Sequence, residues 1–252
     1  MAEPPRQLPL ALPVEVAHGR DDYVVSASNR AAFDLVTAPS WPSDVLLLVG
    51  PEGAGKTHLA AVFAEATGAV VVAAADLAGR DPLALVSTGA VVVEDAGEGD
   101  EGEGEGPRPA DERALFHLLN AVRQSGGRCL ITARRPLAAW GLSLADLASR
   151  LRAATPIELG LPDDRLVEAL LAKLFADRQT TVDPVVVAYL ARRMERSFAA
   201  AARLVEALDR EALAAKSPIT RPLAAQVLAR GFDREPQLPG LDEDAETEKN
   251  SS

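Results

Sequence analysis

The chain has few cysteines and histidines, and this scarcity excludes two kinds of site. Cys129 is the single cysteine in 252 residues, so no internal disulfide can form and a reducing compartment is expected. The three histidines, His18, His58 and His117, have no metal-ligand spacing with Cys129. The sequence therefore predicts neither a disulfide framework nor a zinc site.

Long apolar runs and export signals are also missing. No apolar stretch approaches the ~20 residues that a transmembrane helix requires. The N-terminus lacks the charged and then apolar pattern of a secretory signal. We therefore expect a cytoplasmic protein with no membrane partner.

The chain has fewer basic than acidic residues. Lys and Arg total 26 against 37 Asp and Glu, which gives a net charge of −11 and a pI near 4.8. Residues 97–106 and 232–252 each contribute −5, so the acidity belongs mainly to two solvated segments and the rest of the chain is nearly neutral. This balance argues against sequence-independent nucleic-acid binding through a broad basic face.

Apolar residues make up 48% of the chain, which suffices for a large domain or a medium domain with a small companion. Up to residue 161, strand patterns alternate with helical ones, and this alternation predicts an α/β domain with a parallel sheet covered on both faces. The predicted strands are Val45–Val49, Ala69–Ala73, Ala90–Val93, Cys129–Thr132 and Pro156–Leu159.

The strand signal ends near Asp163, and a small all-helical domain is predicted over residues 162–231. Its helical segments cover residues 163–176, 184–194, 198–215 and 221–229, with prolines at or near several of their starts. Composition sets three other segments apart as poorly ordered: a proline-rich arm at 1–20, an acidic surface loop at 97–110 and an acidic tail at 232–252.

The octapeptide from Gly50 to Thr57 carries the strongest functional signal. It matches GxxxxGK[ST] and lies between an apolar strand and a helical segment, as a phosphate-binding loop does. Glycines let backbone N–H groups surround an anion at a helix N-terminus. We therefore predict a nucleoside-triphosphate site in which Lys56 binds the β- and γ-phosphates and Thr57 binds Mg²⁺. The other predicted contacts are Gly50, Pro51, Gly53, Ala54, Gly55 and His58.

Two carboxylates, Glu94 and Asp95, follow the third predicted strand. In phosphate-loop proteins such an acid binds magnesium beside the phosphates, so Glu94 is the candidate metal ligand and Asp95 the candidate catalytic acid. Their order is the reverse of the usual one, and a displacement of about 1 Å can cost about 10²-fold in rate. Weak or absent intrinsic hydrolysis is expected. The alternative is that both acids merely begin the acidic loop.

Two further positions are candidates for contact with a γ-phosphate. Thr132 ends a strand at a point where a hydroxyl can sense that phosphate, although a β-branched strand residue ahead of solvated arginines fits the pattern equally well. Arg150 precedes the last predicted strand, from where it can project toward a neighbour's nucleotide. Its guanidinium is a rigid and permanently charged fork that suits phosphate.

Three separated segments carry a family resemblance. Residues 21–32 ahead of the loop, Leu130 to Pro136, and Asp146 to Leu151 occur in the order found in the AAA+ domain of the DnaA initiator family. The chain resembles that family from about residue 6 to residue 229, and it is most similar to the shorter, Hda-type members.

The resemblance implies roles for particular residues. Val24 and Val25 would line an adenine pocket, so that the ligand is ADP or ATP with Mg²⁺; Thr132 would be the first sensor; and Arg150 would be an arginine finger acting on a partner. The family's second-sensor arginine would fall near Ala199. Arg196 and Arg203 lie on the same helix face and either could replace it, with Arg203 the chosen candidate; the alternative is that both are ordinary surface arginines.

The resemblance also implies partners. The segment Gln7-Leu8-Pro9-Leu10-Ala11-Leu12 resembles the peptide that binds the DNA polymerase III sliding clamp (beta subunit), with contacts from Gln7, Leu8, Leu10 and Leu12. A proline-rich arm with unrelated leucines is the alternative. The chain passes from the helical segments into an acidic tail, so no sequence-specific DNA binding is expected.

The expected function is therefore regulatory. A clamp-bound chain would stimulate hydrolysis of DnaA-bound ATP and so lower replication initiation, acting on its partner's ATPase more than as an enzyme itself. Two rivals remain. One is a helicase-loader-type ATPase that turns over ATP in a homo-oligomer, and the other is an adaptor whose nucleotide serves stability alone.

Overall fold

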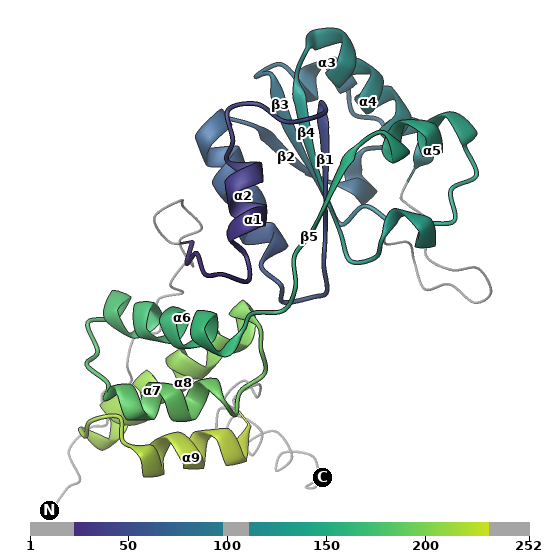
Figure 1. Ribbon diagram of the computed structural model, residues 1–252. Helices are drawn as coiled ribbons and strands as arrows, with labels where there is room; N and C mark the ends of the chain where they lie inside the picture. Colours follow the sequence, from purple (N-terminus) through teal and green to yellow (C-terminus); the bar gives the residue numbers. More distant parts are fainter. Residues whose placement is uncertain (1–22, 98–110, 232–252) are drawn as a thin grey trace, which may run out of the picture. The chain divides into compact units, whose positions relative to one another are not determined.

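The computed structural model describes residues 23–97 and 111–231. The expected clamp-binding residues of the N-terminal arm lie outside these ranges, as do almost all of the acidic loop and the whole acidic tail. The chain forms two compact units (Figure 1). The α/β unit contains Arg30–Gly50 and Lys56–Glu158, and the helical unit contains the chain from Leu159 together with Ser26–Asn29 and Pro51–Gly55.

A sheet of five parallel strands forms the centre of the α/β unit, as predicted. The strand order is β2-β3-β4-β1-β5, and each neighbouring pair is parallel. All residues of β1 are buried, as expected for a strand with both faces covered. The strands are β1 Val45–Val49, β2 Val70–Ala73, β3 Ala90–Glu94, β4 Arg128–Ala133 and β5 Thr155–Glu158.

Helices cover both faces of this sheet. Figure 1 shows α1 and α2 on one side and α3, α4 and α5 on the other. Leu47, Val93 and Ile131 share an apolar cluster with Leu115 of α4 and Leu147 of α5, whereas α2 packs on β3 and β4. The helices are α1 Arg30–Val36, α2 Lys56–Thr67, α3 Pro82–Leu85, α4 Glu112–Ser125 and α5 Ala145–Arg152.

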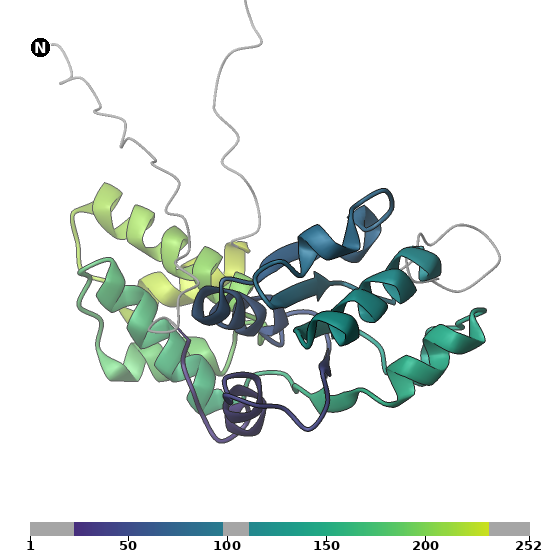
Figure 2. The same cartoon turned by 90° about the horizontal axis from the view of Figure 1, so that it is seen from above.

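The helical unit is a bundle with its own apolar core (Figures 1 and 2). Side chains cap three of its helices: Asp163 accepts from the N–H of Leu166 at 2.7 Å, and Asp183 and Ser197 act in the same way at the next two. Each such cap stabilises its helix by about 1 kcal/mol. The helices are α6 Asp164–Asp177, α7 Pro184–Ala191, α8 Phe198–Ala215 and α9 Arg221–Arg230.

The predicted α/β sheet followed by helices is confirmed, with differences in detail. α7 ends at Ala191 instead of Met194, because the N–H of Arg193 bonds to the carbonyl of Leu190 in a tighter turn at 2.9 Å. The short helices α1, α3 and α5 were not predicted. None of the helices in residues 23–97 and 111–231 is long and apolar enough to cross a membrane.

Candidate functional site

The glycine-rich loop joins β1 to α2 in the way that the motif requires. The N–H of Gly50 bonds to the carbonyl of Ala133 at 3.1 Å, which fixes the start of the loop to the end of β4. Gly53 and Gly55 have φ angles of 76° and 92°, where an L side chain is strained. The backbone therefore turns sharply into the N-terminus of α2, the geometry that presents N–H groups to an anion.

Lys56 and Thr57 occupy the first turn of α2. Lys56 is buried, and its Nζ donates to the carbonyl oxygen of Gly50 at 2.8 Å. This bond folds the side chain back across the loop and keeps the ammonium beside the backbone that would hold phosphate. Thr57 is exposed at the same helix end. Both residues are thus placed as a phosphate-binding lysine and a magnesium-binding hydroxyl would be.

The segment before α1 lies beside the start of α2 through aromatic contacts. The ring of Tyr23 is stacked on Phe33 at 5.4 Å and meets the ring of His58 edge-on at 5.1 Å, measured between centroids. Val24 and Val25, which follow Tyr23, are half-buried. The contact with His58 brings the two candidate adenine-binding valines near the first turn of α2 in the same unit, and their role toward adenine stays a prediction.

The acid pair and Thr132 meet at the ends of neighbouring strands. The N–H of Asp95 donates to the Oγ1 of Thr132 at 3.0 Å, and the N–H of Ala96 donates to its carbonyl at 2.9 Å. Asp95 is exposed with φ 56°, while Glu94 is half-buried at the end of β3. Thr132, with 1% of its surface exposed, therefore shapes the turn that carries both acids, a role that its sequence pattern did not reveal.

The strand order explains why these groups gather. β4 lies between β1 and β3, so the start of the glycine-rich loop, Thr132 and the acid pair all lie at the carboxyl ends of adjacent parallel strands. Parallel sheets bind ligands at this edge. The candidate nucleotide and magnesium residues of the α/β unit are thereby brought together: Gly50, Lys56, Thr57, His58, Glu94, Asp95 and Thr132.

Arg150 lies at the opposite end of the strands, near the amino end of β1. It belongs to the last turn of α5 and lines a hollow of ≈ 720 Å³ together with Ser43, Asp44 and Val45, which precede or begin β1. The glycine-rich loop follows Val49 at the far end of that strand. At roughly 3.3 Å per residue, the length of β1 alone separates them by about 13 Å. Arg150 is therefore not part of the chain's candidate phosphate site.

Arg150 packs against an aromatic ring of α4. Its guanidinium carbon lies 5.1 Å from the centroid of the Phe116 ring on α4, a cation–π contact. Within the described residues it forms no ion pair with Asp146. The side chain is half-buried, so it rests on an aromatic surface and keeps contact with solvent.

The two second-sensor candidates lie in the helical unit. Arg196 forms an ion pair with Asp164 at 2.6 Å, with both side chains about half exposed. Arg203 is exposed on α8, and Ala199 lies at the second position of that helix. The ion pair gives Arg196 a structural explanation within the helical unit, and the assignment of Arg203 stays a prediction.

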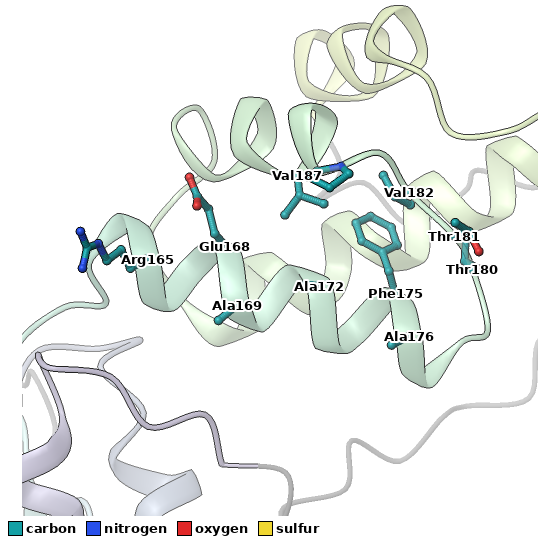
Figure 3. Close-up of a pocket in the computed structure, with 11 residues that line it drawn as sticks. Arg165, Glu168, Ala169, Ala172, Phe175, Ala176, Thr180, Thr181, Val182 and Val187 are labelled. Atoms are coloured by element: carbon teal, nitrogen blue, oxygen red, sulfur yellow. The ribbon is translucent and has the colours of Figure 1, made fainter.

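A separate hollow lies within the helical unit (Figure 3). It measures ≈ 530 Å³ and is lined mainly by alanine, valine and aromatic carbon, with Phe175, Val182 and Val187 among its residues and Arg165 and Glu168 near one end. Most of its lining is apolar, and it contains no glycine-rich loop. The candidate site therefore rests on the sheet edge described above.

Cys129 takes no part in this chemistry. It lies in β4 with 0% of its surface exposed. Burial, and to a lesser extent the negative charge of Asp44, raise the pKa of its thiol. Since the thiolate is the reactive form, the native thiol is expected to be inert.

We therefore expect Cys129 to resist a thiol reagent such as dithionitrobenzoate at pH 8 until the protein unfolds. Release of the coloured product should be slow in buffer and complete in guanidinium chloride. Rapid stoichiometric reaction of the native protein would contradict the buried position of this strand residue.

No family model matches the chain, and no curated protein matches it. Solved structures do. Domain III of the replication initiation protein DnaA from Thermotoga maritima is similar with a TM-score of 0.69 at 16% identity, over 88% of this chain and 100% of that one. The RuvB Holliday junction branch migration motor of the same organism gives 0.65 at 17%, over 85% and 72%. AMPPCP-bound DnaA from Aquifex aeolicus gives 0.56 at 17%, over 77% and 64%.

At these identities the similarity establishes the fold. The five-stranded parallel sheet with its surrounding helices is the AAA+ α/β fold, as the resemblance of three short sequence segments implied.

Proposed function

We propose that this chain is an AAA+ regulator that binds ADP or ATP with Mg²⁺ and acts on the nucleotide of a second AAA+ protein, the DnaA initiator. The observation that carries the proposal is that two candidate phosphate-binding groups lie at opposite ends of the strands of one sheet. The glycine-rich loop with Lys56 lies at the carboxyl edge, and Arg150 lies at the amino edge.

The chain's own nucleotide site is better suited to binding than to rapid turnover. Asp95 is exposed and follows the strand in a left-handed conformation, while Glu94 is only half-buried. A water molecule aligned for attack needs an acid held within a fraction of an ångström of its position. The bound nucleotide would then stabilise the fold and set its conformation, with intrinsic hydrolysis weak or absent.

In this proposal Arg150 completes a site on another molecule. A guanidinium that enters a neighbour's active site stabilises the charge that develops on the transferred phosphoryl group. The guanidinium of Arg150 rests on Phe116, and the side chain is half-buried. The preference for DnaA as the neighbour rests on the family resemblance, and the similar fold of DnaA domain III is consistent with it.

Measurement of ATP hydrolysis by DnaA tests the proposal directly. DnaA loaded with labelled ATP would be incubated alone, with this chain, and with this chain plus sliding clamp loaded on DNA. We expect hydrolysis to accelerate only when all components are present. Equal rates in every mixture would reject the proposed function.

The same geometry also fits a homo-oligomer, because Arg150 of one copy could complete the nucleotide site of the next. A helicase-loader-type ATPase would work in this way. Concentration-dependent ATPase activity of the chain alone, abolished by Arg150→Ala, would favour that second candidate over the first.

Clamp binding is proposed to depend on the N-terminal arm. We expect the triple variant Gln7→Ala, Leu10→Ala and Leu12→Ala to lose clamp binding in surface plasmon resonance, because a glutamine and spaced leucines supply separate anchors in such peptides. Its melting temperature should equal that of the unmodified chain. Unchanged clamp affinity would remove the arm from the mechanism and favour the loader hypothesis.

A further inference from the structure

Helix α5, which carries Arg150, has little to stabilise it on its own. It is 8 residues long, and its N-cap residue, Leu144, makes no side-chain cap. Its third residue is Leu147, so it also lacks the acid that completes a capping box. Isolated helices of this length are unstable in water. The position of Arg150 must therefore be set by contacts from elsewhere in the unit.

Glu112 of α4 supplies the missing carboxylate. One of its oxygens, Oε1, accepts from the N–H of Ser143 at 2.8 Å and from the hydroxyl of Ser143 at 3.0 Å, and Oε2 accepts from the N–H of Leu144 at 2.6 Å. In a capping box, an acid inside the helix bonds to the N–H of the N-cap residue. Here an acid 32 residues earlier in the chain makes that bond, and its negative charge lies at the favourable end of the α5 dipole.

Phe116 supports the other end of α5. It lies one turn after Glu112 on α4, on the same side of that helix, and its ring lies 5.1 Å from the guanidinium carbon of Arg150. Leu147 and Leu151 of α5 are fully buried in the apolar cluster that includes Leu115 of α4. One side of α4 therefore contacts the start of α5, its buried face and its functional arginine.

We infer that Glu112 and Phe116 are positioning residues for Arg150: Glu112 fixes the N-terminus of α5, and Phe116 fixes the direction of the guanidinium. This inference rests on the proposed function for its kinetic consequence, whereas the structural coupling between the three side chains stands apart from it. Displacement of an active group by about 1 Å can cost about 10²-fold in rate, so loss of either support should lower activity without loss of binding.

The kinetic test uses Glu112→Ala and Phe116→Leu in the stimulated hydrolysis of DnaA-bound ATP. We expect the maximal rate to fall by about 10- to 100-fold, with little change in the concentration of chain that gives half the maximal rate. Phe116→Tyr keeps the ring and should retain most of the activity. Asp81→Ala is the matched control, because Asp81 caps a different helix, α3, by accepting from the N–H of Leu83 at 3.0 Å.

A double variant separates positioning from a general structural effect. If Glu112 acts through Arg150, then Glu112→Ala should cause no further loss of rate in an Arg150→Ala background. Additive losses would overturn the inference. Should Glu112→Ala fold poorly, Glu112→Gln, which keeps one acceptor oxygen, and Phe116→Leu provide the same comparison.

A spectroscopic measurement keeps the inference testable even if the chain does not act on DnaA. The Nε–Hε resonance of Arg150, assigned by its loss in Arg150→Lys, should show a ring-current shift that disappears in Phe116→Leu and decreases in Glu112→Ala. Amide exchange of residues 143–148 should also quicken in Glu112→Ala but not in Asp81→Ala. An unchanged Arg150 resonance in both α4 variants would refute the positioning role, whereas shifted resonances with no effect of Arg150→Ala on DnaA would refute only the proposed function.

Discussion

Replacement of Arg150 by alanine is expected to remove nearly all of the stimulation of DnaA-bound ATP hydrolysis, with a small residual rate, and to leave the chain folded, nucleotide-bound and clamp-bound. Where arginine fingers have been measured in GTPase systems, they contribute about 10³- to 10⁵-fold in rate. The cation–π contact with Phe116 contributes about 0.5–2 kcal/mol at a half-buried position. The loss of activity should therefore far exceed any loss of stability.

Two companion variants sharpen this experiment. Arg150→Lys should also fail largely, because an ammonium keeps the charge and loses the planar fork. Arg152→Ala is the matched control, since Arg152 is an exposed arginine in the same last turn of α5. Full stimulation by Arg150→Ala with an unchanged melting temperature would exclude a trans-acting finger. A fall in activity that follows a fall in melting temperature would indicate a structural arginine.

Replacement of Lys56 by alanine is expected to remove tight nucleotide binding. In the unmodified chain, a ligand that binds only the folded state adds about 2.7 kcal/mol to stability at 100 times its dissociation constant. For a chain of this size that corresponds to a rise in melting temperature of roughly 5–10 °C. The variant should show no such rise with ADP and Mg²⁺, because it lacks the ammonium that lies across the loop.

Lys56→Ala removes both the candidate phosphate ligand and the bond from Lys56 to Gly50, and these two effects on stability must be separated. Lys56 is buried and bonds to Gly50, so the variant is also expected to melt lower without nucleotide. The informative quantity is the shift caused by nucleotide in each protein. Lys173→Ala is the control, because Lys173 pairs with Asp177 on the surface of α6 and such pairs contribute little. An undiminished shift in Lys56→Ala, with unchanged affinity by calorimetry, would place the nucleotide elsewhere.

The features that could be predicted from the sequence are those with a local signal. The glycine-rich loop is recognisable because its glycines and its Lys-Thr pair are contiguous, and β1 is recognisable because its five residues are apolar on both faces. The four helices after residue 163 were predicted from helical spacing and proline positions. Each of these signals lies within one segment of the chain.

The features that escaped prediction depend on contacts between distant segments. Helix α5 buries only Leu147 and Leu151, which is too weak a pattern to mark a helix, and its cap comes from Glu112. The bond between Thr132 and the turn at Asp95 depends on β4 lying beside β3, and a strand order cannot be read from spacing. The left-handed residue Asp95 is the one whose N–H makes this bond, so its conformation also belongs to a contact between distant segments.

The placement of the glycine-rich loop and Arg150 on opposite edges of the sheet also restricts how copies or partners can associate. A pair related by a two-fold axis brings identical surfaces together, so an interface confined to one end of the strands would bury two loops or two arginines and leave neither site complete. A head-to-tail arrangement brings one molecule's arginine to another's nucleotide. In such an arrangement each contact has a direction, and a chain that donates Arg150 on one side still exposes its own nucleotide edge to a third molecule on the other.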